Sequence, residues 1–156
     1  MRISESELII TERGSIYHLD LRPEEIANTV FVVGDPASVD LVSEYFDTIE
    51  VKRNHREFKT HTGTYKGKRF SVLSTGIGTD NIDIVMNELD ALVNIDFNTR
   101  TIKKDLKSIT VIRIGTSGAM NPDIALDSIL MSEIAIGFDN LLHFYKNDGI
   151  LEDDFA

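Results

Sequence analysis

An apolar stretch that leads directly into a glycine-containing loop recurs three times along this chain. The stretches, each with the loop that follows it, are Val30–Val33 with Gly34–Pro36, Phe70–Leu73 with Ser74–Gly78, and Ile109–Ile114 with Gly115–Gly118. A continuous apolar run is typical of a strand buried on both faces, so we expect Val30–Val33 and Ile109–Ile114 to be buried strands. In an open α/β sheet, ligands bind at the carboxyl ends of the strands, where these loops would lie.

Helix and strand patterns alternate along the rest of the chain. Residues 81–93 carry apolar side chains at three- and four-residue spacing, which predicts a helix. Residues 48–74 predict extended β structure with a hairpin-like turn at Lys66–Lys68, and Ser128–Ile136 predicts a further strand. Residues 1–16 predict a polar segment that leads into the fold. The sequence therefore predicts an α/β domain.

The composition limits the partners and the chemistry of the chain. Its 16 basic and 26 acidic residues give a net charge of −10, and such a chain repels nucleic acid and anionic lipid. We therefore expect no nucleic-acid partner and no membrane partner. The chain has no cysteine, which excludes thiol catalysis and a cysteine-based zinc site and fits a reducing compartment. Since the polar start also lacks the apolar core of a signal peptide, the sequence predicts a cytoplasmic protein.

The three loops have a chemistry that suits one small anion. Glycine lets backbone N–H groups approach a ligand closely, and hydroxyl and N–H groups bind oxyanions. None of the loops contains the lysine of the nucleoside-triphosphate loop. Position 81 is Asn where a dinucleotide fingerprint that starts at Gly76 would need a glycine. A general nucleotide-binding domain is therefore disfavoured, and each loop taken alone also fits an ordinary turn.

Several polar side chains leave more than one interpretation open. Arg113 lies in an apolar strand, and a buried arginine is costly unless it is paired. It can therefore be a phosphate clamp, a structural ion pair or a residue on a solvent-facing edge. Arg56 and Glu57 also fit a charged surface strand, and His18 alone fits a partly buried packing histidine. His61 and His143 have no partner at the spacing of metal ligands, so we expect no metal site.

Taken in their order along the chain, these and neighbouring stretches are similar to the nucleoside phosphorylase family, and most similar to its uridine phosphorylase branch. The stretches that carry the resemblance are Tyr17–Leu19, Val32–Pro36, His55–Phe58, Thr62–Gly67, Ser74–Gly78, Ile112–Gly118 and Asn121–Ile124. Their number and order make the resemblance far more specific than any single loop. It extends from about His18 to about Tyr145 and implies an α/β fold whose mixed, partly barrel-like central sheet is flanked by helices.

The resemblance implies a pentosyltransferase, a nucleoside phosphorylase that carries out reversible phosphorolysis. A nucleoside and phosphate would give the free base and ribose 1-phosphate, with phosphate as the co-substrate and no metal or organic cofactor in the chemistry. The resemblance also implies a homo-oligomer, either a dimer or a trimer of dimers. Three alternatives stay open: a purine nucleoside phosphorylase, a nucleosidase that uses water, and an inactive fragment that binds phosphate or nucleoside or only assembles with a partner.

The resemblance also assigns roles to individual residues. Phosphate would be held by Gly34, Arg56, Arg113 and Thr116, and Arg113 and Thr116 would take part in catalysis. Arg56 would reach the phosphate in the neighbouring subunit's site. His18 would likewise cross a dimer interface, to the 5′-hydroxyl of the ribose. Phosphate held beneath the sugar would stabilise the positive charge that grows as the glycosidic bond breaks, and would then attack.

A second implied site would hold a monovalent cation at the dimer interface. Its residues would be Glu57, Ile77 and Asn81, and the asparagine replaces a serine of the relatives.

Three features depart from the family pattern. Ser38 stands where the family has an arginine two residues after Gly-Asp-Pro, which removes one expected phosphate ligand. Residues 94–107 form a polar insertion, longer than the matching link in the best-known bacterial members. We expect residues 1–156 to be a single α/β domain, the N-terminal portion of a nucleoside phosphorylase, with the base pocket beyond residue 156.

Overall fold

The computed structural model describes residues 2–146 of the chain. The chain divides into two compact units, Met1–Thr116 and Ser117–Ala156, and the first contains the main sheet. No helix in the described part of the chain is long and apolar enough to cross a membrane.

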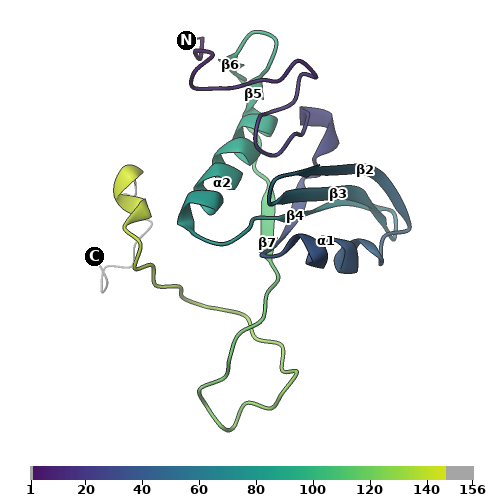
Figure 1. The fold of residues 1–156 in the computed structure, drawn as a ribbon, viewed down its shortest axis with the longest axis vertical. Helices are drawn as coiled ribbons and strands as arrows, with labels where there is room; N and C mark the ends of the chain where they lie inside the picture. Colours follow the sequence, from purple (N-terminus) through teal and green to yellow (C-terminus); the bar gives the residue numbers. More distant parts are fainter. Residues whose placement is uncertain (1, 147–156) are drawn as a thin grey trace. The chain divides into compact units, whose positions relative to one another are not determined.

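The first unit is built around a five-stranded mixed sheet (Figure 1). Its elements in chain order are the 3-10 helix η1 (Pro23–Glu25), β1 (Thr29–Val33), α1 (Pro36–Ser43), β2 (Thr48–His55), β3 (Phe58–Tyr65), β4 (Lys68–Ser74), α2 (Thr79–Asn94), β5 (Ile95–Asp96), β6 (Thr101–Ile102) and β7 (Thr110–Arg113). The strand order is β2-β3-β4-β1-β7. Strand β1 pairs in parallel with β4 and β7, whereas β3 is antiparallel to β2 and β4. The predicted α/β class with a mixed central sheet is confirmed.

Local sequence signals place the helix start and the tight turn of the sheet. The Asp35 side chain accepts a hydrogen bond from the Ala37 N–H at 3.1 Å, and Pro36 occupies the first turn, which together start α1. Lys66 and Gly67 both have positive φ, 49° and 74°, in the turn between β3 and β4. Two such residues in a two-residue turn match the twist of the paired strands, so the predicted hairpin forms.

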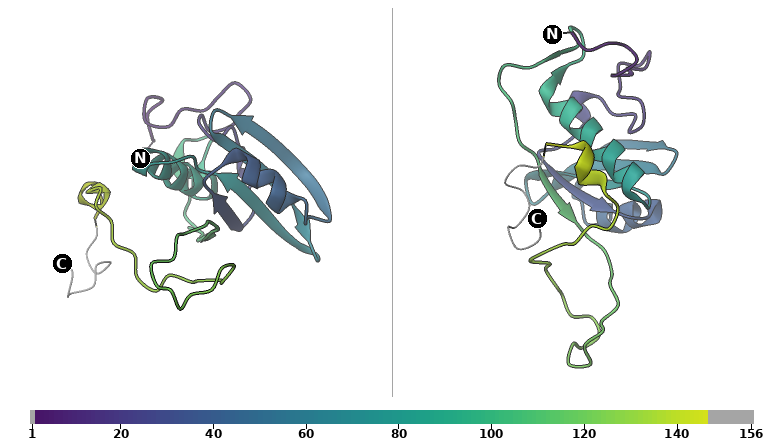
Figure 2. Two further views of the ribbon diagram at one scale, coloured as in Figure 1. Left: turned by 60° about the horizontal axis from the view of Figure 1, so that its bottom comes forward. Right: turned by 90° about the vertical axis from the view of Figure 1, so that its left-hand side faces the viewer.

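One helix packs on each face of the sheet (Figure 2). Alternate residues of a strand point to opposite faces, so β1 contributes to both cores. Val30 of β1 and Leu89 of α2 belong to the larger core, which lies on one face. Val33 of β1, Val39 of α1 and Val72 of β4 form the smaller core on the other face. The predicted helix over residues 81–93 is confirmed as α2.

The N-terminal segment is more than the polar lead-in that the sequence predicts. Leu8 and Ile16 are buried in the larger core, and an isolated bridge joins Ile10 to Ile16. The prediction was wrong because these apolar residues are spread singly among polar ones and show no periodic pattern. The segment therefore packs against the sheet and carries His18 with it.

Strand β7 is an edge strand, which corrects the prediction of a buried strand over Ile109–Ile114. It pairs with β1 alone among the described strands, and Ile112 is 42% exposed. Arg113 is also exposed. The apolar run predicted burial on both faces, but burial depends on a neighbour on each side, which a single run does not reveal.

The polar insertion of residues 94–107 contains a short antiparallel pair, with Ile95 opposite Ile102. The side chain of Asn94 closes the insertion. Its Oδ1 accepts the Lys107 N–H at 2.7 Å, and its Nδ2 donates to the Lys107 carbonyl at 3.1 Å.

The second unit is irregular over its described residues, 117–146, apart from the 3-10 helix η2 (Leu141–Phe144). The predicted strand over Ser128–Ile136 was wrong, because these residues are exposed and pair with no strand among the described residues. An extended segment needs a partner for its backbone groups, and the sequence pattern does not supply one.

The tightest approach between strands generates a test of the fold. A Cβ added at Gly63 of β3 would overlap the Thr48 carbonyl oxygen and lie 2.9 Å from Phe46 Cδ2. The backbone of β2 cannot move away without breaking its pairing with β3. We expect Gly63→Ala to lower the free energy of unfolding by at least about 1–3 kcal/mol, measured by urea denaturation.

The matched control is Gly34→Ala, because a Cβ there meets nothing within 4 Å. We expect it to change the unfolding free energy by less than about 1 kcal/mol. Equal effects of the two substitutions would contradict the close approach at Gly63.

Candidate functional site

The predicted site residues gather at one edge of the main sheet. Because β1, β4 and β7 are parallel, the residues that follow them, such as Gly34, Gly76 and Thr116, emerge at the same edge. Strand β3 is antiparallel to β4, so the turn between β2 and β3, which carries Arg56 and Glu57, lies there as well. The predicted convergence of the strand-end loops is therefore present in the fold.

Gly34, Arg113 and Thr116 lie on neighbouring strand ends. Val32 is paired with Arg113, and the Ile114 N–H donates to the Val32 carbonyl at 2.9 Å. The space above Gly34 is open. The Arg113 guanidinium has no hydrogen-bond or ion-pair partner among residues 2–146, so its donors are available to an anion.

Arg56 and His18 form a separate group with Tyr17 and His55, which we call the hairpin cluster. The Arg56 guanidinium carbon lies 5.9 Å from the centre of the Tyr17 ring, and that ring meets His18 edge-on at 4.9 Å. His55 Nδ1 is 3.0 Å from the His18 carbonyl oxygen, to which it donates. Arg56 has a φ of 56°, a value that is uncommon outside glycine and that occurs here in the tight turn between β2 and β3.

The hairpin cluster and the Arg113 group lie at opposite ends of the strand order. Strands β4 and β1 stand between β3 and β7. At ~4.8 Å for each strand spacing, β3 and β7 are about 14 Å apart. The structure therefore places Arg113 on the strand beside the one that leads into Gly34, and brings Arg56 close to His18, but sets these two groups apart within one chain.

The three residues predicted for a cation lie together around Gly76. Gly76 has a φ of +68°, and a Cβ on it would lie 2.5 Å from Asn81 Nδ2 and 3.1 Å from Glu57 Cγ. The Asn81 amide donates to the Ile77 carbonyl at 3.3 Å. The oxygen donors that one chain offers here are the Glu57 carboxylate and the Ile77 carbonyl, since Asn81 presents its nitrogen. The set fits a cation only in part.

Glu88 of α2 contacts His18, and the sequence analysis did not predict this contact. Its carboxylate accepts hydrogen bonds from the main-chain N–H groups of His18 and Leu19 and from the His18 ring. The Glu88 side chain is only 12% exposed. A signal was present, because Glu88 lies three residues after Val85 and four before Leu92, on the apolar stripe of the helix.

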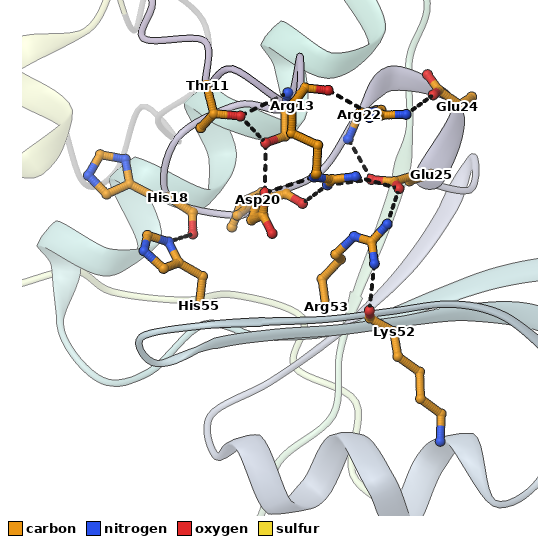
Figure 3. A network of polar contacts seen from close by, with 12 residues as sticks. Thr11, Arg13, His18, Asp20, Arg22, Glu24, Glu25, Lys52, Arg53 and His55 are labelled. Carbon is orange, nitrogen blue, oxygen red and sulfur yellow. Dashed lines mark hydrogen bonds and ion pairs between the residues drawn. The ribbon is translucent and has the colours of Figure 1, made fainter.

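A network of arginines around Glu25 holds the segment that carries His18 (Figure 3). Arg13 donates to both oxygens of the Glu25 carboxylate at 2.9 Å, and Arg53 of β2 donates to one of them at 2.6 Å. Arg13 also pairs with Asp20 at 3.2 Å. The Arg22 N–H donates to Glu25 at 2.8 Å. The segment between Arg13 and Glu25 is thus tied to itself and to the sheet.

These contacts change the acidity of Glu25. Burial by itself raises the pKa of this carboxyl, but the hydrogen bonds from Arg13, the Arg22 N–H and Arg53 outweigh burial and lower the pKa to about 2. The hydrogen bond to Glu25 in turn raises the pKa of Arg13.

Comparison with known proteins gives one family. The sequence model of the Phosphorylase superfamily matches residues 28–154. A uridine phosphorylase of Thermococcus kodakarensis is 36% identical over 126 residues, which cover 81% of this chain and 40% of that protein. A DeoD-type purine nucleoside phosphorylase of Levilactobacillus brevis is 34% identical over 134 residues, 85% of this chain and 52% of that protein. The chain thus spans about half the length, or less, of these relatives.

Solved structures agree in fold. A Trypanosoma brucei nucleoside phosphorylase that shows uridine phosphorylase activity has a TM-score of 0.68 and 37% identity, over 76% of this chain and 41% of that one. A uridine phosphorylase of the oomycete Phytophthora capsici has a TM-score of 0.63 and 28% identity, over 80% of this chain and 39% of that one.

The arginine network predicts how stability depends on pH. Because the pKa of Glu25 is lower in the folded than in the unfolded protein, its contribution is fully present above pH 4.5 and is lost as the pH falls toward about 2. We expect Glu25→Gln to lower the free energy of unfolding by roughly 3 kcal/mol at pH 7. The difference between wild type and variant should shrink as the pH falls from 4.5 to 2.

Urea denaturation across this pH range measures the effect. Glu24→Gln is the matched control, because the Glu24 side chain is adjacent in sequence but 69% exposed. We expect it to change the free energy of unfolding by less than about 0.5 kcal/mol. A Glu25 effect that does not vary with pH would refute the ion-pair explanation.

Proposed function

The chain belongs to the Phosphorylase superfamily, and from this premise we propose that it is the phosphate-binding portion of a nucleoside phosphorylase of the uridine phosphorylase type. The observation that carries the proposal is the exposed guanidinium of Arg113, which has no partner among residues 2–146 and extends from the strand beside the one that leads into Gly34. Two of the relatives named above, a uridine phosphorylase and a purine nucleoside phosphorylase, support the reaction class.

In the proposed reaction, phosphate replaces the base on C1′ of the ribose. The C1′–N bond breaks, its electron pair leaves with the base, and an oxygen of phosphate forms the new bond to C1′. The base takes up a proton, so that free base and ribose 1-phosphate result. Arg113 would orient phosphate and balance its charge, and the Thr116 hydroxyl would donate to it. An arginine at the end of a strand is held by the sheet, which favours a fixed geometry.

The separation of the hairpin cluster from Arg113 supports a site shared between copies of the chain. We propose that Arg56 and His18 complete the site of a neighbouring subunit, with Arg56 on phosphate and His18 on the ribose 5′-hydroxyl. The assembly would be a homo-oligomer, a dimer or a trimer of dimers.

The group around Gly76 is the proposed place for a monovalent cation at that interface. Glu57 and the Ile77 carbonyl would supply two oxygens, and the same pair from a second copy would supply two more. Asn81 would hold the Ile77 loop through its hydrogen bond.

The cysteine-free sequence is compatible with the cytoplasm, which we propose as the compartment.

Phosphate binding tests the role of Arg113 directly. An arginine–phosphate contact contributes about 1.5–3 kcal/mol, so we expect Arg113→Ala to weaken binding of inorganic phosphate by roughly 10- to 150-fold. Isothermal titration calorimetry of the chain measures the dissociation constant. Lys104→Ala is the control, because it removes one positive charge from an exposed residue in the segment between β6 and β7. Equal weakening by both variants would show that only net charge matters.

Release of base from uridine tests the reaction class. We expect any uracil that the chain releases to require phosphate and to be matched by an equal amount of ribose 1-phosphate, both measured by chromatography. Inosine in place of uridine tests the purine alternative, which the DeoD-type relative supports. Release without phosphate would identify a nucleosidase and overturn the proposal. No release from a folded, phosphate-binding chain would limit its role to binding.

A further inference from the structure

The Glu88 carboxylate is surrounded by hydrogen-bond donors from one short stretch of the chain. The His18 N–H donates to both of its oxygens, at 3.0 and 3.1 Å, and the Leu19 N–H donates to Oε2 at 2.8 Å. His18 Nδ1 lies 2.7 Å from Oε1. An ionised carboxylate only accepts hydrogen bonds, so Nδ1 must be the nitrogen that carries a proton.

This contact determines which nitrogen of the His18 ring is free for a ligand. In the neutral ring, a proton on Nδ1 leaves Nε2 with a lone pair and no hydrogen. Nε2 has no hydrogen-bond partner among residues 2–146, and the His18 side chain is 29% exposed. The ring therefore offers an acceptor to whatever approaches it.

The ring is also fixed in position from the side of the sheet. His55 Nδ1 donates to the His18 carbonyl at 3.0 Å, and the Tyr17 and Phe58 rings meet His18 edge-on at 4.9 and 6.3 Å. Helix α2 thus holds the main chain and the ring on one side, and β2 holds the carbonyl on the other. Such a residue is oriented before a ligand binds.

We propose that Glu88 is a positioning residue that keeps His18 in the Nδ1–H form, so that the site selects nucleosides with a free 5′-hydroxyl over nucleoside 5′-phosphates. A 5′-hydroxyl donates its proton to the Nε2 lone pair. A fully ionised 5′-phosphate presents only acceptors to the Nε2 lone pair of the neutral ring, and two acceptors repel each other. The choice of ligand rests on the proposed function, whereas the protonation of the ring does not.

A single substitution reverses the effect of Glu88. In Glu88→Gln, the amide oxygen at the place of Oε2 still accepts the main-chain N–H groups of His18 and Leu19. The amide NH2 then takes the place of Oε1, 2.7 Å from His18 Nδ1, and donates to it. Nδ1 becomes the acceptor and the proton moves to Nε2. The His18 and Leu19 N–H groups keep their bonds to the oxygen at the Oε2 place, and only the bond from the His18 N–H to the Oε1 place is lost.

Nitrogen-15 NMR of the histidine rings in the full chain measures this change. We expect the wild-type His18 to show the shift of a protonated nitrogen at Nδ1 and of an unprotonated one at Nε2, at a pH where the ring is neutral in the same titration. In Glu88→Gln the two shifts should exchange. His55 serves as an internal reference, because its Nδ1 donates to a carbonyl in both proteins.

The control is Asp80→Asn, which removes the same charge from an exposed position on the same helix and should leave the His18 shifts unchanged. An Nε2–H form in the wild type, or no exchange of shifts in Glu88→Gln, would overturn the proposal. Because the measurement needs no substrate, its outcome is separate from that of the phosphorylase proposal.

Ligand titrations test the selectivity. We expect the wild type to bind uridine more tightly than uridine 5′-monophosphate, and Glu88→Gln to reduce this preference by roughly tenfold. An unchanged preference despite the exchanged shifts would overturn the selectivity and leave only the ring geometry. If the folded wild type binds neither ligand, the proposed function fails while the ring measurement still decides the role of Glu88.

Discussion

The parallel pairing of β1 on both of its edges is the constraint on which the candidate site depends. Because β4 and β7 run in the same direction as β1, the loops that follow these three strands meet at one edge of the sheet. The antiparallel return of β3 then brings the turn that carries Arg56 to the same edge. Sheet topology, rather than one local motif, thus gathers residues as distant in sequence as Gly34 and Thr116.

Two carboxylates, the buried Glu25 and the half-buried Glu88, hold the segment that carries His18 to the sheet and to α2. The chain has a net charge of −10, so it is rich in carboxylates, and burying one is costly unless donors surround it. Glu25 receives the guanidinium groups of Arg13 and Arg53, and Glu88 receives main-chain N–H groups and an imidazole. Glu25 links the segment to β2 through Arg53, and Glu88 links it to α2, so the segment is fixed between β2 and α2.

Local patterns predicted much of this fold, and contacts between distant residues account for what they missed. The helix over residues 81–93, the hairpin turn at Lys66 and Gly67, and the loops after apolar runs all follow from short-range spacing or turn chemistry. The exposure of β7 does not, because it depends on which strands pair beside it. The contact of Glu88 with His18 spans 70 positions, so only its place on an apolar stripe hinted at it.

The placement of the exposed cations gives the strongest structural reason to consider a shared site. Arg113 and the hairpin cluster with Arg56 lie on one edge, yet β4 and β1 separate the two groups within one chain. A second copy that places its hairpin cluster beside the Arg113 of the first would bring both guanidinium groups to one anion. Two cationic groups at one dianion attract it more strongly than either alone. The division of the proposed site between two ends of the sheet is therefore the structural argument for the proposed assembly.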